Sequence, residues 1–356
     1  MDKKIKVGII GVGGIAQEHI RAYRQNPNVE LYAFCDINEE RLKNQGETHG
    51  VTHLFTDVNE MVKLPELDAV SVCTWNNGHA PCTIAALKAG KDVLCEKPMA
   101  MNAEEAKAMI AAAEESGRLL MIGFVRRYGN DMDVLQDFIK ADYFGEFYYS
   151  KVAYLRRNGC PGGWFANKEL SGGGPLIDLG VHVIDFVRYA FGNPKPVSVY
   201  GATFDKLKDR PGLKTKVGYA SVDAGKERTY DVEDLATALI RFDDGKVINV
   251  EASFSLDMEH SNKGEIELFG TKGGAKINPS LHLYSTANGY MVNTEIQAET
   301  ALSFGGLFKK EIDHYVDCLL GKAECRSPAI DGLRLMQILD AIYKSACTGH
   351  EVLIED

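Results

Sequence analysis

The sequence lacks the cysteine patterns that mark disulfide-rich or zinc-binding proteins. It has eight cysteines but no C-x-x-C pair. Cys35, Cys73 and Cys95 lie in apolar strand patterns, where a thiol acts as a small hydrophobic group. We therefore expect reduced thiols in a cytoplasmic protein, with no disulfide framework and no metal site. The first strand pattern begins by Ile5, which leaves no room for a signal peptide.

Long apolar runs and an excess of positive charge are also lacking. No apolar run approaches the roughly 18–20 residues that a membrane span needs. The net charge is −10 and the pI is about 5.5, whereas nucleic-acid-binding proteins usually carry a basic face. We therefore predict neither a nucleic-acid partner nor a membrane partner.

What is present is a long chain that begins with alternating strands and helices. At 356 residues it is long for one hydrophobic core, so we expect two domains. Residues 1–122 are predicted to form a Rossmann domain with a doubly wound parallel sheet, because continuous apolar strands such as 69–73 suit a sheet covered on both faces. The expected strands are 5–10, 29–35, 68–73, 92–95 and 119–123, and the expected helices are 14–26, 38–48, 79–89 and 103–117.

From residue 123 to 356 the pattern changes to consecutive strands with short turns, which predicts an α/β domain built on a mostly antiparallel sheet with helices on one face. Asp243-Asp244-Gly245 indicates a hairpin turn, and 205–231 is expected to be a long loop. The expected strands are 146–154, 196–204, 233–242, 246–255, 264–270 and 274–278. The expected helices are 130–142, 176–191, 306–320 and 329–348, of which the last is expected to pack back toward the first domain.

A glycine-rich turn follows the first strand and has the spacing G-x-G-x-x-A, in Gly11, Gly13 and Ala16. Gly11 permits the tight turn, Gly13 leaves the backbone open to a pyrophosphate, and Ala16 allows the helix to pack closely on the strand. The next strand ends in Asp36, where an acid can accept hydrogen bonds from an adenosine ribose. The stretch predicts a dinucleotide site that also includes Gly14 and Ile15, and Asp36 favours NAD over NADP because it would repel a 2′-phosphate.

A second candidate site follows the strand 92–95, in Glu96-Lys97-Pro98. Ligands of open parallel sheets lie at the carboxyl ends of the strands, and Lys97 is at such an end. A lysine there can donate to a substrate oxygen and stabilise a developing alkoxide. Pro98 ends the strand and is a candidate for a cis peptide bond.

A third constellation follows the glycine loop 172–174 and contains Asp178, His182 and Asp185. The spacing i, i+4, i+7 places these side chains on one face of an α-helix. An acid beside a histidine supports its protonated form, so the histidine could take a hydroxyl proton. Two alternatives stay open at this point. Asp178 and His182 could bind zinc, although no third ligand is evident, or Asp178 could cap the helix while His182 is a core residue.

These three stretches together resemble the family of glucose–fructose oxidoreductase, inositol 2-dehydrogenase and rhizopine-catabolism (Gfo/Idh/MocA) proteins, over essentially the whole chain. The resemblance implies a Rossmann domain followed by an α/β domain whose open sheet forms oligomer interfaces. It also implies that Lys97, Asp178 and His182 line the active site, with His182 as the acid/base. The loop after strand 68–73 would run along the nicotinamide ribose, and its candidate cofactor residues, with those of the second site, are Thr74, Trp75, Asn76, His79, Glu96 and Lys97.

The stretch 122–128 is similar to the part of inositol dehydrogenases that brings an arginine to the substrate, which makes Arg127 a candidate. Other candidate substrate residues are Tyr154, Arg156 and Trp164, because tryptophan stacks on sugars and arginine binds hydroxyls. Inositol dehydrogenases tend to have a histidine near Arg156. The stretch 146–170 has none, which weakens inositol itself as the substrate.

The preferred hypothesis is therefore a cytoplasmic NAD-dependent dehydrogenase that oxidises a secondary alcohol of a sugar, glycoside or cyclic polyol, as a homodimer or homotetramer. NADP is the less expected cofactor, although Arg41 near Asp36 could soften the preference. Two alternatives share the cofactor. Some relatives cleave glycosides by transient oxidation without net redox change, and others are non-catalytic dinucleotide-binding regulators.

Overall fold

The structure, a computed structural model, describes residues 4–208, 220–221, 229–277, 280–300 and 303–355. The chain forms two compact units. Unit 1 comprises residues 1–128 and 303–333, and unit 2 comprises residues 129–302 and 334–356. Compared with the expected boundary at 122, unit 1 therefore extends to residue 128 and also includes a segment from near the end of the chain.

Unit 1 is built on a parallel sheet, which confirms the predicted Rossmann fold. In the described residues the sheet has six strands in the order β3-β2-β1-β4-β5-β6, all parallel. The strands are β1 (Ile5–Ile10), β2 (Val29–Cys35), β3 (His53–Phe55), β4 (Ala69–Val72), β5 (Asp92–Glu96) and β6 (Leu120–Gly123). The helices are α1 (Ala16–Gln25), α2 (Glu39–His49), α3 (Val58–Met61), α4 (Asn76–Lys88), α5 (Ala103–Ser116), the 3₁₀ turn η1 (Val125–Tyr128) and α9 (Phe304–Leu319).

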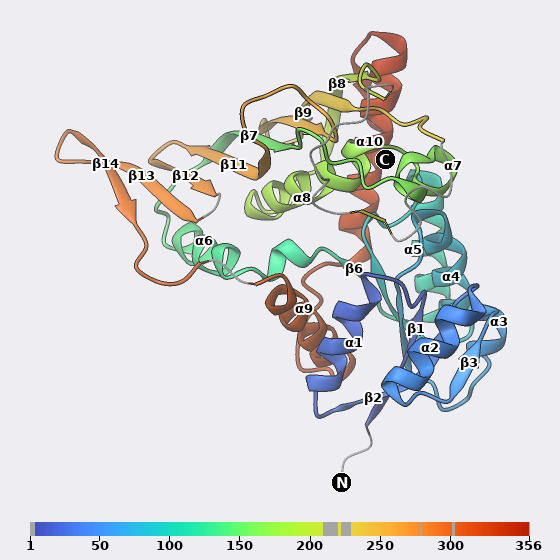
Figure 1. Cartoon of the computed structure of the whole chain (residues 1–356). Coiled ribbons are helices and arrows are strands. Elements are labelled where there is room, and N and C mark those ends of the chain that lie inside the picture. The colour runs from blue at the N-terminus through green and yellow to red at the C-terminus, as the bar shows by residue number, and fades with distance from the viewer. Residues whose placement is uncertain (1–3, 209–219, 222–228, 278–279, 301–302, 356) are drawn as a thin grey trace. The chain divides into compact units, whose positions relative to one another are not determined.

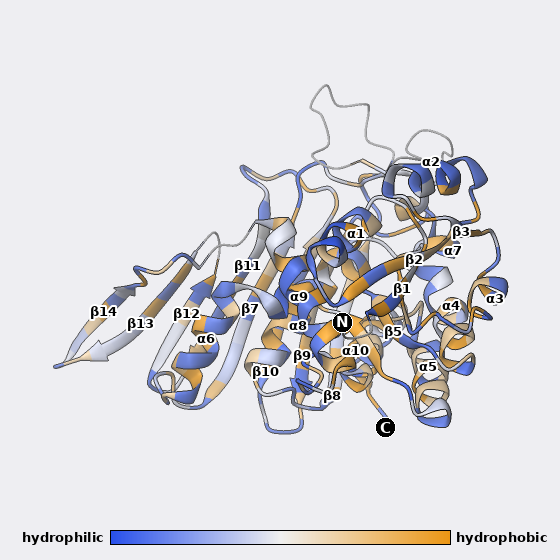
Figure 2. Cartoon of the chain, turned by 90° about the horizontal axis from the view of Figure 1, so that it is seen from below, coloured by the Kyte–Doolittle hydropathy of each residue, from blue (hydrophilic) through white to orange (hydrophobic). Residues whose placement is uncertain are grey.

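The register of this sheet aligns the carboxyl ends of its central strands. Ile10 ends β1 and pairs with Cys35 of β2 on one side and with Val72 of β4 on the other. The chain order reverses between β1 and β4, and ligands of such sheets bind at this switch point. β1 and β2 are largely hydrophobic and α2 largely hydrophilic (Figure 2), as expected for strands covered on both faces and a helix on the surface.

Helix α9 comes from late in the chain and packs beside α1 in the same unit (Figure 1). The rings of His19 and Phe308 lie 5.5 Å apart, and Asn26 donates a hydrogen bond of 2.9 Å to Asp313. Unit 1 also contains a buried ion pair in which an Nη of Arg127 lies 2.8 Å from Asp331. Removing one partner of a buried ion pair lowers the stability of a protein by about 3–5 kcal/mol. This pair therefore stabilises the packing of η1 against residues 303–333.

Unit 2 contains a mostly antiparallel sheet, as predicted. In the described part of the chain its nine strands have the order β14-β13-β12-β11-β7-β10-β9-β8-β15, and only β7 and β10 pair in parallel. The strands are β7 (Phe147–Leu155), β8 (Pro196–Phe204), β9 (Leu235–Phe242), β10 (Val247–Ser253), β11 (Asn262–Gly270), β12 (Gly273–Ile277), β13 (Leu281–Ala287), β14 (Tyr290–Glu295) and β15 (Val352–Leu353). The helices are α6 (Asn130–Lys140), α7 (Lys168–Ser171), α8 (Val181–Ala190), the second part of α10 (Ala329–Thr348) and two short turns, η2 (Gly163–Ala166) and η3 (Leu176–Gly180).

One face of the unit 2 sheet packs on helices. Helix α8 contacts β7, β10 and β11, and the second part of α10 lies on β8, where the Ser345 hydroxyl accepts the Gly201 N–H at 2.9 Å. Along β9 every second residue is buried, whereas Leu239 on the other face is 42% exposed. This alternation is the pattern of a sheet with one face covered. The turn at 243–245 is a hairpin turn with Gly245 at φ 86°, as predicted.

The structure corrects several sequence predictions. Helix α4 begins at Asn76, three residues before the expected start, and the predicted helix 176–191 is wrong as one continuous α-helix because it begins with a π turn, η3. The sequence analysis does not predict several short or exposed elements, namely β3, α3, η1, η2, α7, β13, β14 and β15. Most of the expected loop 205–231 lies outside the described residues.

In the described part of the chain, one stretch passes a length and composition test for a membrane helix. It is Lys168–Ala190, and 78% of its apolar window is buried inside the protein. The same stretch comprises α7, η3 and α8, which lies on the unit 2 sheet. A core helix passes the same test, so this finding is weak evidence for a membrane span.

Candidate active site

The glycine turn after β1 is held between the ends of two neighbouring strands. The Gly11 N–H donates to the Cys35 carbonyl at 2.8 Å, and Gly11 has φ 82°. A Cβ on Gly11 would lie 2.7 Å from the Cys73 carbonyl oxygen. Only glycine therefore fits at this position. At Gly13, by contrast, an added Cβ would meet no atom within 4 Å, so the backbone there is open.

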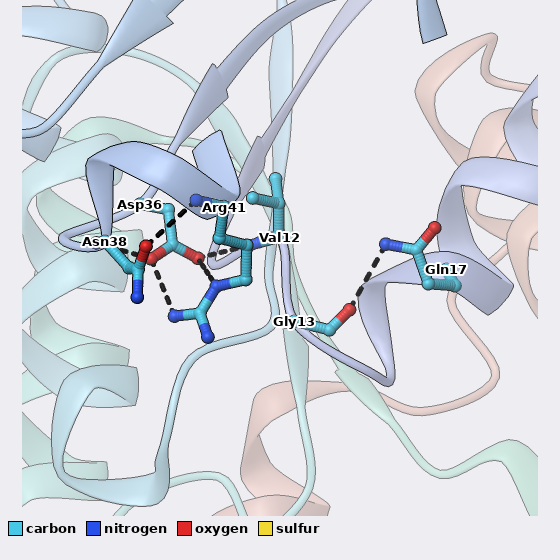
Figure 3. Close-up of polar contacts among 6 residues, drawn as sticks. All are labelled: Val12, Gly13, Gln17, Asp36, Asn38 and Arg41. Atoms are coloured by element: carbon cyan, nitrogen blue, oxygen red, sulfur yellow. Dashed lines mark hydrogen bonds and ion pairs between the residues drawn. The ribbon is translucent and has the colours of Figure 1, made fainter. Parts of the chain in front are cut away.

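Asp36 lies at the end of β2 beside this turn (Figure 3). One of its oxygens accepts the Val12 N–H at 2.9 Å and the other accepts the Asn38 N–H at 2.8 Å. Arg41, in the first turn of α2, donates to the same two oxygens through Nε at 2.9 Å and Nη2 at 2.8 Å. The structure thus brings Asp36 to the glycine turn and pairs it with Arg41 in a bidentate ion pair.

The residues that follow β4 begin helix α4 early. Thr74 and Trp75 are half-buried before the helix, and Asn76 is buried in its first turn. His79 is buried, with Nδ1 2.6 Å from the Pro98 carbonyl oxygen and Nε2 3.2 Å from the Thr74 carbonyl oxygen. Burial lowers the pKa of His79, and a neutral imidazole has one N–H, so it can donate to only one of these two carbonyls. The buried ring nevertheless packs between the loops after β4 and β5.

Glu96 points into the interior of unit 1. Its Oε1 lies 2.7 Å from His19 Nε2, and its Oε2 accepts the Lys97 backbone N–H at 3.1 Å. Burial raises the pKa of Glu96, but the hydrogen bond and charge of His19, together with Lys97 and His79, outweigh burial and hold the pKa below its usual value. A carboxylate that is buried and paired in this way positions the backbone of Lys97.

His19, Glu96 and Glu311 form a buried cluster whose ligand-type atoms lie within 4.8 Å of one another. The His19–Glu96 distance of 2.7 Å is that of a direct hydrogen bond. Two ligands of one metal ion would be about 3 Å or more apart, because each lies about 2 Å from the metal. The distance therefore fits a direct hydrogen bond between His19 and Glu96 better than two ligands of one metal ion. Sequence analysis missed His19, although a histidine on the apolar face of α1 is a visible signal.

Lys97 is half-buried at the carboxyl end of the sheet, and the Lys97–Pro98 bond is cis, as the sequence suggested. Arg127, predicted to reach the substrate, is instead completely buried. Its Nη1 donates to the Arg326 carbonyl and to Asp331, each at 2.8 Å. These contacts give Arg127 a structural role within unit 1.

In unit 2 the glycine loop before η3 is fixed by Glu233 and Tyr343. Glu233 accepts the Gly174 N–H at 2.9 Å and the Leu176 N–H at 3.2 Å, and the Tyr343 hydroxyl donates to Glu233 at 2.9 Å. A Cβ on Gly173 would lie 2.0 Å from the Tyr343 hydroxyl oxygen. This explains the glycines in structural terms, and sequence analysis missed both Glu233 and Tyr343 because their distance along the chain hides the contact.

The predicted acid–histidine constellation spans the π turn and the start of α8. The Val181 N–H bonds to the Leu176 carbonyl, five residues earlier, so the α-helical spacing applies only from Val181 onward. Asp178 and His182 are half-buried, whereas Asp185 is 1% exposed. Asp185 therefore belongs to the core. Single π turns inside helices often occur at functional sites.

The other substrate candidates in unit 2 lie on β7 and the loop after it. η3 packs on β7 and β10. Tyr154 of β7 is in register with Ala252 of β10. Ala252 in turn lies close to Gly180 of η3, because a Cβ added to Gly180 would lie 3.5 Å from the Ala252 Cβ. Arg156 lies over the Tyr154 ring at 5.6 Å and donates to the Gly159 carbonyl at 2.9 Å. Trp164, in η2, is half-buried against Phe165.

Comparison with known proteins decides the family. Residues 5–124 match the model of an oxidoreductase family with an NAD-binding Rossmann fold, and residues 136–354 match that family's C-terminal α/β domain. The chain belongs to the Gfo/Idh/MocA oxidoreductase family. It is an oxidoreductase, and NAD is the cofactor of its Rossmann domain. The open backbone at Gly13 and the Asp36 carboxylate at the end of β2 fit a dinucleotide.

Several relatives are named for sugar or polyol substrates. The chain is 34% identical to D-glucoside 3-dehydrogenase of Escherichia coli over 98% of this chain and 97% of the relative. It is 28% identical to myo-inositol 2-dehydrogenase of Thermotoga maritima over 76% of this chain and 74% of the relative. Aldose-aldose oxidoreductase from Caulobacter crescentus, complexed with glycerol, has a TM-score of 0.81 at 26% identity, covering 99% of this chain and all of that structure.

Replacing Gly13 with valine tests the glycine turn. We expect an unchanged unfolding temperature, because a Cβ at Gly13 meets no neighbour within 4 Å, and NADH binding weakened about tenfold or more, because the side chain occupies the face that a pyrophosphate approaches. NADH fluorescence and differential scanning calorimetry measure the two effects.

The matched comparison is Gly11→Ala, which should lower the unfolding temperature itself, because its Cβ would collide with the Cys73 carbonyl. NADH binding by Gly13→Val equal to that of the wild type would contradict this account of the turn.

Proposed function

We propose that this protein is an NAD-dependent dehydrogenase that oxidises a secondary hydroxyl group of a sugar, glycoside or cyclic polyol, with glucosides as the first class to test. The observation that carries the substrate class is the 34% identity to D-glucoside 3-dehydrogenase over nearly the full length of both chains. The relatives named above are dehydrogenases and oxidoreductases, and none of them favours the redox-neutral or regulatory alternatives.

The proposed cofactor residues are those at the carboxyl edge of the unit 1 sheet. The Gly11–Ile15 turn would hold the pyrophosphate, and Asp36 would accept hydrogen bonds from the adenosine ribose. Thr74, Trp75 and Asn76 would contact the nicotinamide half of NAD. His79 and Glu96 would support the cofactor site indirectly, by fixing the loops that follow β4 and β5. NAD, when bound, supplies the acceptor for the hydride.

The proposed catalytic residues are Lys97, Asp178 and His182. An imidazole nitrogen of His182 takes the proton of the substrate hydroxyl as the C–H bond breaks, and Asp178 supports the imidazolium that forms. The Lys97 ammonium donates to a substrate oxygen and stabilises a developing negative charge there. All three side chains are half-buried. This supports the proposal, because each is partly shielded from water and still accessible to a substrate. Tyr154, Arg156 and Trp164 are the proposed contacts with the rest of the sugar.

A substrate panel tests the function together with its acid/base. We expect NAD reduction with methyl glucosides and weaker activity with inositols, because the stretch 146–170 has no histidine. His182→Asn should lower kcat about 100-fold or more, the usual contribution of general base catalysis. NADH absorbance with each compound, at saturating NAD, is the measurement.

His260→Asn is the matched control, because the His260 side chain is 84% exposed in the same unit, and it should retain wild-type kcat. Absence of NAD reduction across glucosides, hexoses and inositols would refute the function. Glycoside cleavage without NADH accumulation would establish the redox-neutral alternative, and undiminished kcat in His182→Asn would remove that residue from the mechanism.

We also propose a cytoplasmic homodimer or homotetramer that associates through the uncovered face of the unit 2 sheet. Tyr200 and Leu239 are register partners on that face and are 56% and 42% exposed. Light scattering should give a dimer or tetramer mass, and Tyr200→Glu with Leu239→Glu should shift it toward the monomer, because charges cannot be buried there without partners. A monomeric wild type would contradict the proposal.

A further inference from the structure

The Asp36 carboxylate has no acceptor capacity to spare. A carboxylate offers about four lone-pair sites, and Asp36 accepts four N–H groups, from Val12, Asn38 and two nitrogens of Arg41 (Figure 3). A ribose diol that donates to Asp36 must therefore displace a donor already present.

The four donors differ in how readily they can leave. The N–H groups of Val12 and Asn38 belong to the backbone and are fixed by the turn after β1 and by the start of α2. The Arg41 side chain is long and 27% exposed, and the Arg41 backbone is held independently, because its N–H donates to the Asn38 side chain at 2.9 Å. The guanidinium is thus the donor that can move without disturbing the turn.

We propose that Arg41 determines how this protein distinguishes NAD from NADP, and that it makes both usable. With NAD, the guanidinium yields two acceptor sites of Asp36 to the ribose hydroxyls. With NADP, the 2′-phosphate has no proton to donate to Asp36. It accepts hydrogen bonds from the Arg41 guanidinium instead, whose planar, bidentate geometry suits phosphate. This inference concerns the cofactor alone and does not depend on the sugar substrate.

Charge supports the same assignment. An Asp36 carboxylate alone would repel a 2′-phosphate, but the bidentate ion pair with Arg41 neutralises it. The phosphate also lies favourably near the N-terminus of α2, an 11-residue helix. Glu39 and Glu40, both exposed in the first turn of α2, oppose a phosphate. NAD therefore remains the preferred cofactor, and NADP binds more weakly.

Direct binding measurements with NADH and NADPH test the inference without any sugar. Arg41→Gln should weaken NADPH binding about tenfold to a hundredfold, the loss expected when hydrogen bonds to a charged group are removed. NADH binding should stay the same or become tighter, because Asp36 is released for the ribose. Arg41→Lys should give intermediate NADPH binding, since it keeps the charge but loses the fork.

Arg118→Gln is the matched control. Arg118 also pairs with an aspartate, Asp92, at 3.7 Å, but Asp92 begins β5 at the amino end of the strand, away from the edge where dinucleotides bind. Arg118→Gln should therefore leave the affinities for NADH and NADPH unchanged. If the ratio of the NADPH and NADH affinities is the same in Arg41→Gln as in the wild type, the inference is overturned. It is also overturned if Arg41→Gln unfolds at the wild-type temperature but loses affinity for both cofactors equally. NADPH binding too weak to detect in the wild type would also overturn it.

Discussion

The close approach of Gly11 to the Cys73 carbonyl is the contact on which the nucleotide site depends. A side chain at Gly11 would have to occupy space that lies within 2.7 Å of that oxygen. Because the turn fits this closely, the end of β1 lies directly between the ends of β2 and β4. Asp36 can then accept the Val12 N–H, and the loop that begins at Thr74 emerges at the same edge. One backbone constraint thus gathers groups from separate strands into one site.

Buried polar contacts then fix the loops that this edge presents. His79 lies between the carbonyls of Pro98 and Thr74, and Glu96 holds the Lys97 backbone while it pairs with His19 of α1. Each of these groups is costly to bury unless it is partnered. The position proposed for a reacting lysine is therefore set by buried side chains that fix the backbone on both sides of it. In unit 2, Glu233 has the same function for the glycine loop before η3.

Local patterns in the sequence predict the parallel sheet and the glycine turn of the Rossmann unit, because the glycine spacing, the apolar strands and Asp36 all lie within one continuous stretch. They do not predict the short elements β3 and α3, or that α9 joins this unit from late in the chain. The cis bond at Pro98 was also accessible from one dipeptide. The contacts of His19 with Glu96 and of Glu233 with the glycine loop join residues 77 and 59 positions apart, and nothing local encodes them. The hairpin β13–β14 is different. Its turn, Asn288-Gly289, has positive φ at both residues and is a strong hairpin signal that the sequence analysis overlooked.

A dehydrogenase of this kind moves a hydride from a secondary alcohol carbon of a sugar, glycoside or polyol to NAD. The most direct measurement uses the best substrate of the panel, deuterated at its ring carbons, and determines the deuterium content of the NADH that accumulates. We expect one deuterium in each molecule of NADH formed, and one ketone formed in the product for each NADH. NADH without deuterium, or product formed while no NADH accumulates, would contradict the proposed function.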